Sequence, residues 1–185
     1  ESQSIVNNES SEIIRILNGP LGVLGTQDID LYPEQHRQEI DSLNALIYTN
    51  LNNGVYRAGF ATQQSPYDDA VRCVFDTLDL LESRLADRSF LVGERFTEAD
   101  VRLFPTLLRF DVVYVSHFKC NLKRLIDYPH LSRYLRRIYD HPGIAETCHI
   151  DHIKTHYFGS HPTLNPSAII PIGPNDWLVD TDIER

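Results

Sequence analysis

The sequence predicts an all-α protein, a helical bundle preceded by the end of another structure. Apolar residues recur at intervals of three and four along most of the chain, which is the spacing of one helix face. Strand-like alternation is almost absent, and only residues 4–6 look like the end of a strand. Proline and glycine separate the helical stretches from one another. We therefore expect packed helices, and not a sheet, to form the core.

The first two helices follow from their caps and breakers. Apolar positions within 13–17 predict a short helix that stops at the Asn-Gly-Pro of residues 18–20. After a loop, Pro33 suits the first turn of a second helix, whose apolar residues recur until Asn53-Gly54. Residues 52–60 (NNGVYRAGF) then predict a turn-rich junction that displays its side chains.

The next two helices have acidic N-terminal turns. Ser65 and the acids that follow it open a helix whose buried stripe runs within 71–85. The Thr-Glu-Ala-Asp of residues 97–100 is a capping arrangement before a strongly apolar segment. Pro105 lies inside that segment, where we expect it to kink the helix or reset its start.

Prolines also start the last predicted elements. Pro129 opens a helix that runs to about residue 138, and Pro142 is expected to start the final helix, which continues through a histidine-rich stretch. Beyond Ser160, four prolines predict an extended, irregular tail.

Composition limits the class of protein. The formal net charge is −9 at pH 7, which argues against a nucleic acid or an anionic membrane as partner, because phosphate contacts need clustered Lys and Arg. No apolar run approaches the roughly 18 residues that span a bilayer. Three cysteines without a short spacing favour a reducing compartment, so we expect a cytoplasmic location. The chain begins with Glu1 and contains no Met, so we expect a piece of a longer protein.

The histidine-rich stretch is CHIDHIKTHYFGSHP, residues 148–162. His149, His152 and His156 are spaced three and four apart, so on a helix they would share one face, and His161 follows. Three zinc ligands along one helix span more than a turn, and no H-E-x-x-H is present. We favour histidines that line a polar cleft over a metal site, and expect no metal.

Cysteines and tyrosines are the other candidates for chemistry. Cys73 and Cys148 are predicted to be buried structural thiols, whereas Cys120, which follows a lysine, stays open between a structural and a reactive role. Tyr56 and Tyr157 carry phenols that can donate a hydrogen bond to a carbonyl or a developing oxyanion. From the residues alone, packing aromatics remain the alternative for both.

Five stretches together resemble one family. They are NNESSEIIRILN (7–18), NNGVYRAGFA (52–61), FTEADVRLFPTLLRFDVVYVSHFKCN (96–121), DYPHLSRYLRRIY (127–139) and DHIKTHYFGSH (151–161). In order and spacing they are similar to the glutathionyl-hydroquinone reductases, the omega-like xi class of glutathione transferases. The resemblance covers essentially the whole chain, and the TEAD cap alone would indicate only the wider superfamily.

The resemblance implies a domain division. Residues 1–20 would be the end of an otherwise missing thioredoxin-like domain, residues 21–165 the helical C-terminal domain of a glutathione transferase, and residues 166–185 an extended tail. In the family a cysteine of the thioredoxin-like domain is the nucleophile. None of the three cysteines here lies in such a motif, so none inherits that role.

The resemblance also implies a reaction and a site. A cysteine thiolate attacks the glutathionyl sulfur of a glutathionyl-hydroquinone, and a second glutathione releases oxidised glutathione. Glutathione is thus the co-substrate, and a cytosolic homodimer formed through the helical domains is expected. The alternatives are an inactive binding or dimerisation module, and an omega-type transferase with another electrophilic substrate. The expected site residues are Tyr56 and Tyr157 for the quinol oxygens, Glu9 and Ser10 for the γ-glutamyl group, and Arg57, His152, His156 and His161 around the pocket.

Overall fold

Helices form all the regular structure of the described residues, as the apolar periodicity predicts. The structure, a computed structural model, describes residues 5, 7–25 and 29–178. The α-helices are α1 (Ser10–Asn18), α2 (Arg37–Ile47), α3 (Gly54–Gly59), α4 (Gln64–Arg84), α5 (Glu98–Arg109), α6 (Val115–His117), α7 (Pro129–Tyr139) and α8 (Ile150–Ser160). The short 3-10 turns are η1 (Gly22–Leu24), η2 (Glu34–His36), η5 (Leu125–Asp127) and η6 (Ala145–Thr147). The predicted strand end falls outside the described residues except for Ile5, which has no regular structure.

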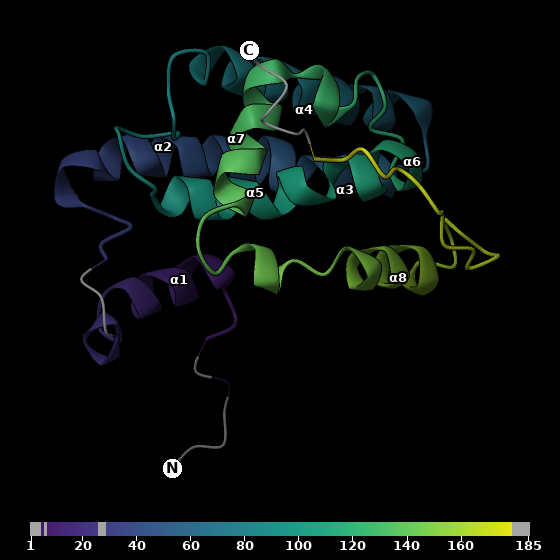
Figure 1. The fold of residues 1–185 in the computed structure, drawn as a ribbon. Helices are drawn as coiled ribbons and strands as arrows, with labels where there is room; N and C mark the ends of the chain where they lie inside the picture. The colour runs from purple at the N-terminus through teal and green to yellow at the C-terminus, as the bar shows by residue number, and fades with distance from the viewer. Residues whose placement is uncertain (1–4, 6, 26–28, 179–185) are drawn as a thin grey trace.

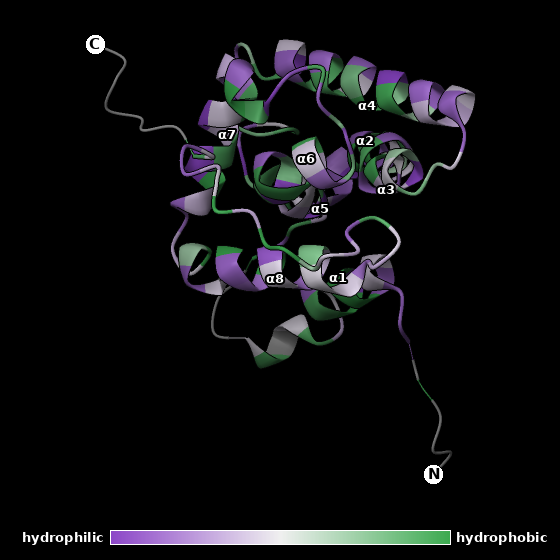
Figure 2. Cartoon of the chain, turned by 90° about the vertical axis from the view of Figure 1, so that its right-hand side faces the viewer, coloured by the Kyte–Doolittle hydropathy of each residue, from purple (hydrophilic) through white to green (hydrophobic). Residues whose placement is uncertain are grey.

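The helices are arranged in layers around the central helices α2 and α5 (Figure 1). Helix α4 packs on α3 on one side of the central helices, and α1 and α8 lie on the other side. Figure 2 shows the same layers turned by 90°. The core is contributed by the expected stripes, with Ile40, Ile47, Val74, Leu78, Leu81 and Leu103 fully buried. Each such side chain contributes roughly 1.5–3 kcal/mol relative to exposure.

Two π-helical turns interrupt the helices. They are η3 (Tyr48–Asn52), between α2 and α3, and η4 (Phe110–Tyr114), between α5 and α6. A π turn contains one residue more than an α turn and is frequent at functional sites. Turn η3 lies just before α3, which carries Tyr56, and η4 contains Tyr114; both tyrosines belong to the candidate site described below.

Helix α3 replaces the predicted turn-rich junction. A Cβ at Gly54 would lie 2.9 Å from Val74 Cγ2, and one at Gly59 would lie 2.2 Å from the ring of Phe118. These two glycines are therefore not loop residues: their missing side chains let α3 pack closely on α4 and on Phe118. Asn53-Gly54 marks the start of this helix, so the interpretation of residues 52–60 as a displayed loop is wrong.

The N-terminus of α5 is held by a capping box, as its sequence predicts. Asp100 is fully buried and accepts hydrogen bonds from the amides of Leu91 and Thr97, the Thr97 hydroxyl and the Tyr134 hydroxyl. The helix continues from Glu98 across Pro105 to Arg109, so the proline does not reset its start.

The last helix begins later than predicted. Gly143, with φ of +86°, follows Pro142 at once, and this left-handed residue stops a helix from continuing. The chain then forms η6, and α8 begins at Ile150 with His149 as its N-cap. Thus His149 caps the helix and is not one of its helical residues.

Ionic contacts fasten α1 and the tail to the bundle. Glu98, almost fully buried, accepts hydrogen bonds from Arg15 of α1 at 2.9 Å and from Asn44 of α2 at 2.9 Å. Buried Lys154 of α8 donates to the carbonyls of Ile172 and Gly173 in the tail, which has no regular structure from 161 to 178. Within the part of the chain that is described, no helix combines the length and the hydropathy needed to cross a bilayer.

Candidate functional site

Three tyrosines from three parts of the chain meet in a hydrogen-bonded row. The Tyr157 hydroxyl of α8 lies 2.5 Å from the Tyr56 hydroxyl of α3 and 3.1 Å from the Tyr114 hydroxyl of η4. Tyr56 is 38% exposed, whereas Tyr157 is 5% and Tyr114 2% exposed. Both tyrosines singled out in the sequence thus lie together, with one end of the row open to solvent.

Phe118 forms the floor beneath the three phenol rings. It is fully buried, with its ring centroid 5.2 Å from Tyr56, 5.4 Å from Tyr114 and 5.9 Å from Tyr157. Rings at these distances pack favourably and fix each other's orientation. Gly59 makes room for Phe118, so the close packing of α3 also places the phenols.

Burial keeps the phenols of Tyr56 and Tyr114 protonated. It raises the pKa of Tyr56 to about 12, with the hydrogen bond between Tyr56 and Tyr157 acting in the same direction, and it raises the pKa of Tyr114 well above its usual range. At neutral pH the row therefore offers hydrogen-bond donors and not phenolates. The Arg109 guanidinium opposes the rise in the pKa of both groups.

The direction of the row follows from the cost of a buried, unpaired donor. Three hydroxyls joined by two hydrogen bonds leave one proton over, at one end or, if Tyr157 accepts both bonds, in the middle. If Tyr56 donated inward, the spare proton would be that of Tyr114 or of Tyr157, both of which are buried, and this costs about 1–3 kcal/mol. We infer that Tyr114 donates to Tyr157 and Tyr157 to Tyr56, which leaves the Tyr56 hydroxyl to donate outward.

A histidine pair closes the side of the row. His117 Nε2 lies 3.0 Å from His161 Nδ1, and the two rings stack at 5.3 Å. His117 follows Tyr114 by three residues and His161 follows Tyr157 by four, so the pair joins the two segments that carry these phenols. Burial lowers the pKa of both imidazoles. Positive charge acts in the same direction, from His161 and Lys119 on His117 and from His156 on His161.

The pair predicts a loss of stability in mild acid. A lowered pKa means that the unfolded chain binds protons more readily, so the free energy of unfolding rises with pH. The contribution is complete above the unfolded pKa of about 6.5 and is lost as the pH falls through the lower folded values. Urea titrations between pH 5 and pH 8 measure it. The variant His161→Gln, which does not titrate, should have a flatter profile, and an identical profile would contradict the assignment.

The other predicted pocket residues do not all join the phenols. The exposed His156 lies beside Tyr157, with ring centroids 5.3 Å apart, and His161 is in the pair. His152 instead lies next to His149, at 5.1 Å between centroids, one turn or more along α8. Arg57 donates to the Thr49 carbonyl at 2.7 Å and belongs to a separate hollow that contains Cys73. The contacts given for His152 and Arg57 thus join neither of them to a tyrosine hydroxyl, and their expected part in the substrate pocket stays a prediction.

Glu9 and Ser10 stand at the start of α1. Both are exposed, and Glu9 is the N-cap residue, although its side chain makes no capping hydrogen bond. A helix start with free amides and a nearby hydroxyl suits a carboxylate ligand. These residues keep their predicted role as a proposal.

The cysteines differ from the prediction in burial. Cys120 is fully buried, and this burial raises its thiol pKa to about 12, which marks a structural residue. Cys73 and Cys148, predicted to be buried structural thiols, are only half-buried. Burial also raises the pKa of the Cys148 thiol, despite opposing effects of Thr147 and Arg109.

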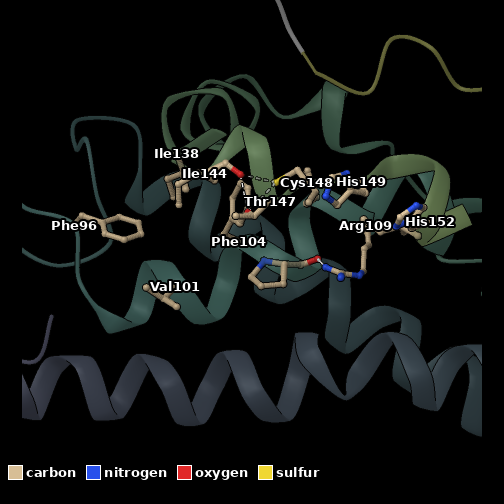
Figure 3. A pocket seen from close by; sticks show the side chains of 13 residues that line it. Phe96, Val101, Phe104, Arg109, Ile138, Ile144, Thr147, Cys148, His149 and His152 are labelled. Carbon is tan, nitrogen blue, oxygen red and sulfur yellow. Dashed lines mark hydrogen bonds between the residues drawn. The ribbon is translucent and has the colours of Figure 1, made fainter. Parts of the chain in front are cut away.

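A pocket of about 440 Å³ lies between α5 and the segment from η6 into α8 (Figure 3). It contains none of the three tyrosines. Its lining residues include Phe96, Val101, Phe104, Arg109, Ile144, Cys148, His149 and His152. Among the described residues, no three His, Cys, Asp or Glu side chains gather so that they could hold a metal ion.

Three further residues of this region, Tyr114, His117 and Arg109, have no role predicted from the sequence. All three lie in the FTEADVRLFPTLLRFDVVYVSHFKCN segment, where the sequence predicts a helix cap and the family resemblance. A useful signal was available, because Tyr114 and His117 are spaced three apart and so share a helix face.

Comparison with known proteins shows that the chain is similar to glutathione transferases. The family model described as "Glutathione S-transferase, C-terminal domain" matches residues 63–137. The glutathionyl-hydroquinone reductase PcpF of Sphingobium chlorophenolicum is 56% identical over 170 residues, which are 92% of this chain and 54% of PcpF. The glutathionyl-hydroquinone reductase YqjG of Escherichia coli is 53% identical over 94% of this chain and 53% of YqjG.

Solved structures agree. The glutathione-bound structure of YqjG superposes with a TM-score of 0.90 at 54% identity, covering 92% of this chain and 56% of that one. The structure of the Xi-class transferase of Natrialba magadii superposes with a TM-score of 0.93 at 45% identity, and the match covers 97% of this chain and 55% of that one. The chain spans about half the length of the curated relatives it matches. It is thus a relative of the glutathionyl-hydroquinone reductases of the Xi class and carries the helical fold of a glutathione S-transferase C-terminal domain.

Proposed function

We propose that this chain forms the quinol-binding side of a glutathione-dependent reductase that removes glutathione from glutathionyl-hydroquinones. The observation that supports the proposal best is the row of three neutral phenols, with Tyr56 at its open end, in a chain related to proteins named for that reaction. A row of this kind donates a hydrogen bond to a ring oxygen and stabilises negative charge there.

The chemistry requires a thiolate from outside the described residues. It attacks the glutathionyl sulfur, a protein–glutathione disulfide forms, and the bond between sulfur and ring carbon breaks. The electron pair passes to the ring carbon, which takes up a proton, and the hydroquinone departs. A second glutathione then reduces the disulfide and leaves as oxidised glutathione. Tyr56 and Tyr157 hold the ring oxygens during the first step.

Glutathione itself is proposed to contact the start of α1. Glu9 pairs with the α-ammonium of the γ-glutamyl group, and the Ser10 hydroxyl and first-turn amides take its α-carboxylate. Residues 1–20 belong in this view to a thioredoxin-like domain, residues 21–165 to the helical domain and residues 166–185 to a tail. The assembly is a cytoplasmic homodimer that pairs through its helical domains.

The second candidate is a helical binding or dimerisation module that does no chemistry by itself. The cysteines favour it for the isolated chain, because burial raises the thiol pKa of both Cys120 and Cys148 and neither is activated.

Turnover of a glutathionyl-hydroquinone by the whole gene product, beside the 185-residue chain alone, tests both candidates. We expect the gene product to release hydroquinone and oxidised glutathione, and the isolated chain to be inactive because it lacks the nucleophile. A glutathione conjugate of an unhydroxylated phenyl ring is the matched control. Equal turnover of that control would favour an omega-type transferase, and activity of the isolated chain would overturn the assignment of the nucleophile.

A further inference from the structure

Helix α8, which carries Tyr157, is held by few buried side chains. Of its eleven residues, the buried ones are Lys154, Tyr157 and Phe158. A helix that packs on a bundle usually buries an apolar stripe along its length. Here a lysine occupies the buried position three residues before Tyr157, so the two side chains lie on the same face of α8. The place of Tyr157 therefore depends on what holds Lys154.

Lys154 binds the chain that follows α8. Its ammonium donates to the carbonyl of Ile172 at 2.7 Å and to that of Gly173 at 3.1 Å. A buried ammonium is costly unless its protons have partners, and these two carbonyls supply them. The side chain of Ile172 is 92% exposed, so it does not hold the tail there by apolar contact. Lys154 thus joins α8 to the tail through polar contacts.

The far part of the tail is anchored elsewhere in the bundle. Figure 1 shows the tail, in yellow, turning back from the end of α8 over the bundle. Asp176 accepts two parallel hydrogen bonds from the Arg124 guanidinium, at 3.0 and 2.9 Å. Trp177 packs edge-on against Tyr139 at the end of α7, with ring centroids 5.6 Å apart. The segment from Gly173 to Asp176 is therefore fastened at both ends.

Arg124 also contacts η4, the π turn that contains Tyr114. Its guanidinium lies 3.4 Å from the carboxylate of Asp111, whose side chain is 2% exposed. Asp111 precedes Tyr114 by three residues, the same interval that separates the lysine of α8 from its tyrosine. A continuous set of contacts therefore runs from α8 through the tail and Arg124 to η4. Each of its two ends lies three residues before a phenol, and the hydroxyl oxygens of these two phenols are 3.1 Å apart.

We propose that the tail (161–178) is a brace that holds the tyrosine row together, with Lys154 and Asp176 as positioning residues. The brace keeps α8 at the distance from η4 at which the Tyr157 hydroxyl can bond to both of its neighbours. A hydrogen bond depends closely on distance and angle, so a small displacement of α8 would open the row. Both residues act through Tyr157 and not on the substrate. The kinetic consequence rests on the proposed reductase function, whereas the brace itself does not.

A double-mutant cycle in the whole gene product tests whether Lys154 acts through Tyr157. Lys154→Met keeps much of the side-chain length and removes the donors. We expect it to lower kcat for a glutathionyl-hydroquinone about tenfold, because a misplacement of about 1 Å can lower a rate by roughly 100-fold. In a Tyr157→Phe background the same change should lower kcat less than about twofold, since the hydroxyl that it positions is gone. Lys123→Met, at a lysine that is 50% exposed, is the matched control and should change neither rate.

Two further variants separate a positioning role from a merely structural one. Lys154→Arg keeps a charged donor and should restore most of kcat. Asp176→Ala removes the other anchor, at a side chain that is 64% exposed, and should lower kcat about threefold. It should add little to Lys154→Met, because both changes release the same brace. Since Asp176 is exposed, its variant carries the cycle with Tyr157→Phe if Lys154→Met does not fold.

Hydrogen exchange of the α8 amides tests the brace without turnover. We expect faster exchange in α8 for Lys154→Met and Asp176→Ala, with the exchange of α2 unchanged. If glutathionyl-hydroquinones are not turned over at all, the proposed function fails, and this measurement still decides about the brace. Three results would overturn the inference: unchanged α8 exchange in both variants, wild-type kcat in Lys154→Met, or an equal loss of kcat with and without the Tyr157 hydroxyl.

Discussion

Replacing Asp100 by Ala is expected to lower the free energy of unfolding by about 3–5 kcal/mol, the cost of breaking a fully buried charged network. The carboxylate accepts four hydrogen bonds: the Leu91 amide and the Tyr134 hydroxyl bind one oxygen, and the Thr97 amide and hydroxyl bind the other. It thereby holds the start of α5, the loop before it and α7 together. Without it, these buried donors have no partner and no access to water.

Urea unfolding followed by circular dichroism measures the effect. Asp69→Ala is the matched control, since Asp69 is 75% exposed with only a 3.9 Å ion pair to Arg72, and it should change stability by less than about 0.5 kcal/mol. If Asp100→Ala does not fold, Thr97→Ala removes only the capping hydroxyl and should cost about 1 kcal/mol. Equal urea midpoints for the Asp100 and Asp69 variants would show that the network is not stabilising.

Removing the outward phenol donor should give the largest effect on activity. In the whole gene product, Tyr56→Phe is expected to lower kcat for a glutathionyl-hydroquinone by about 100-fold, the usual value of one donor to a developing oxyanion. Tyr157→Phe should have an effect of similar size. The Tyr157 hydroxyl donates to the Tyr56 oxygen and so makes the Tyr56 hydroxyl a stronger donor, and the variant lacks this hydroxyl. Tyr114→Phe removes only the buried end and should cost less than about tenfold.

Single-turnover release of hydroquinone is the measurement. Tyr48→Phe, at a phenol that is 51% exposed and outside the row, is the control and should leave kcat unchanged. A double Tyr56→Phe, Tyr157→Phe variant with wild-type kinetics would exclude the phenols from the mechanism. An effect of Tyr114→Phe larger than that of Tyr56→Phe would reverse the direction inferred for the row.

Local signals in the sequence predicted the helices well where a single segment determines the outcome. The stripe of α4, the capping box of Thr97 and the N-terminal Pro129 of α7 are all confirmed. Errors came at residues whose conformation depends on packing against a segment that is far away in the sequence. Gly54 and Gly59 resemble loop glycines until α4 and Phe118 are seen to occupy the space beside them. The misplaced start of the last helix is the exception, because it depends on the left-handed conformation of Gly143, the residue next to Pro142.

The candidate site was predictable only in part for the same reason. Tyr56 and Tyr157 were identified by resemblance, and their meeting across about 100 residues is a property of the packed bundle. His117 and His161 are 44 residues apart, and no spacing rule pairs them.

The two π turns make the tyrosine row depend on chain length. Each turn, η3 before Tyr56 and η4 at Tyr114, holds one residue more than an α turn, and one helical residue corresponds to a rotation of about 100°. A one-residue deletion inside either turn would restore a regular helix but rotate the following phenol out of the row. Insertions and deletions within these ten residues should therefore disturb the site more than most substitutions there. The number of residues in each turn, and not only their identity, determines whether the phenols meet.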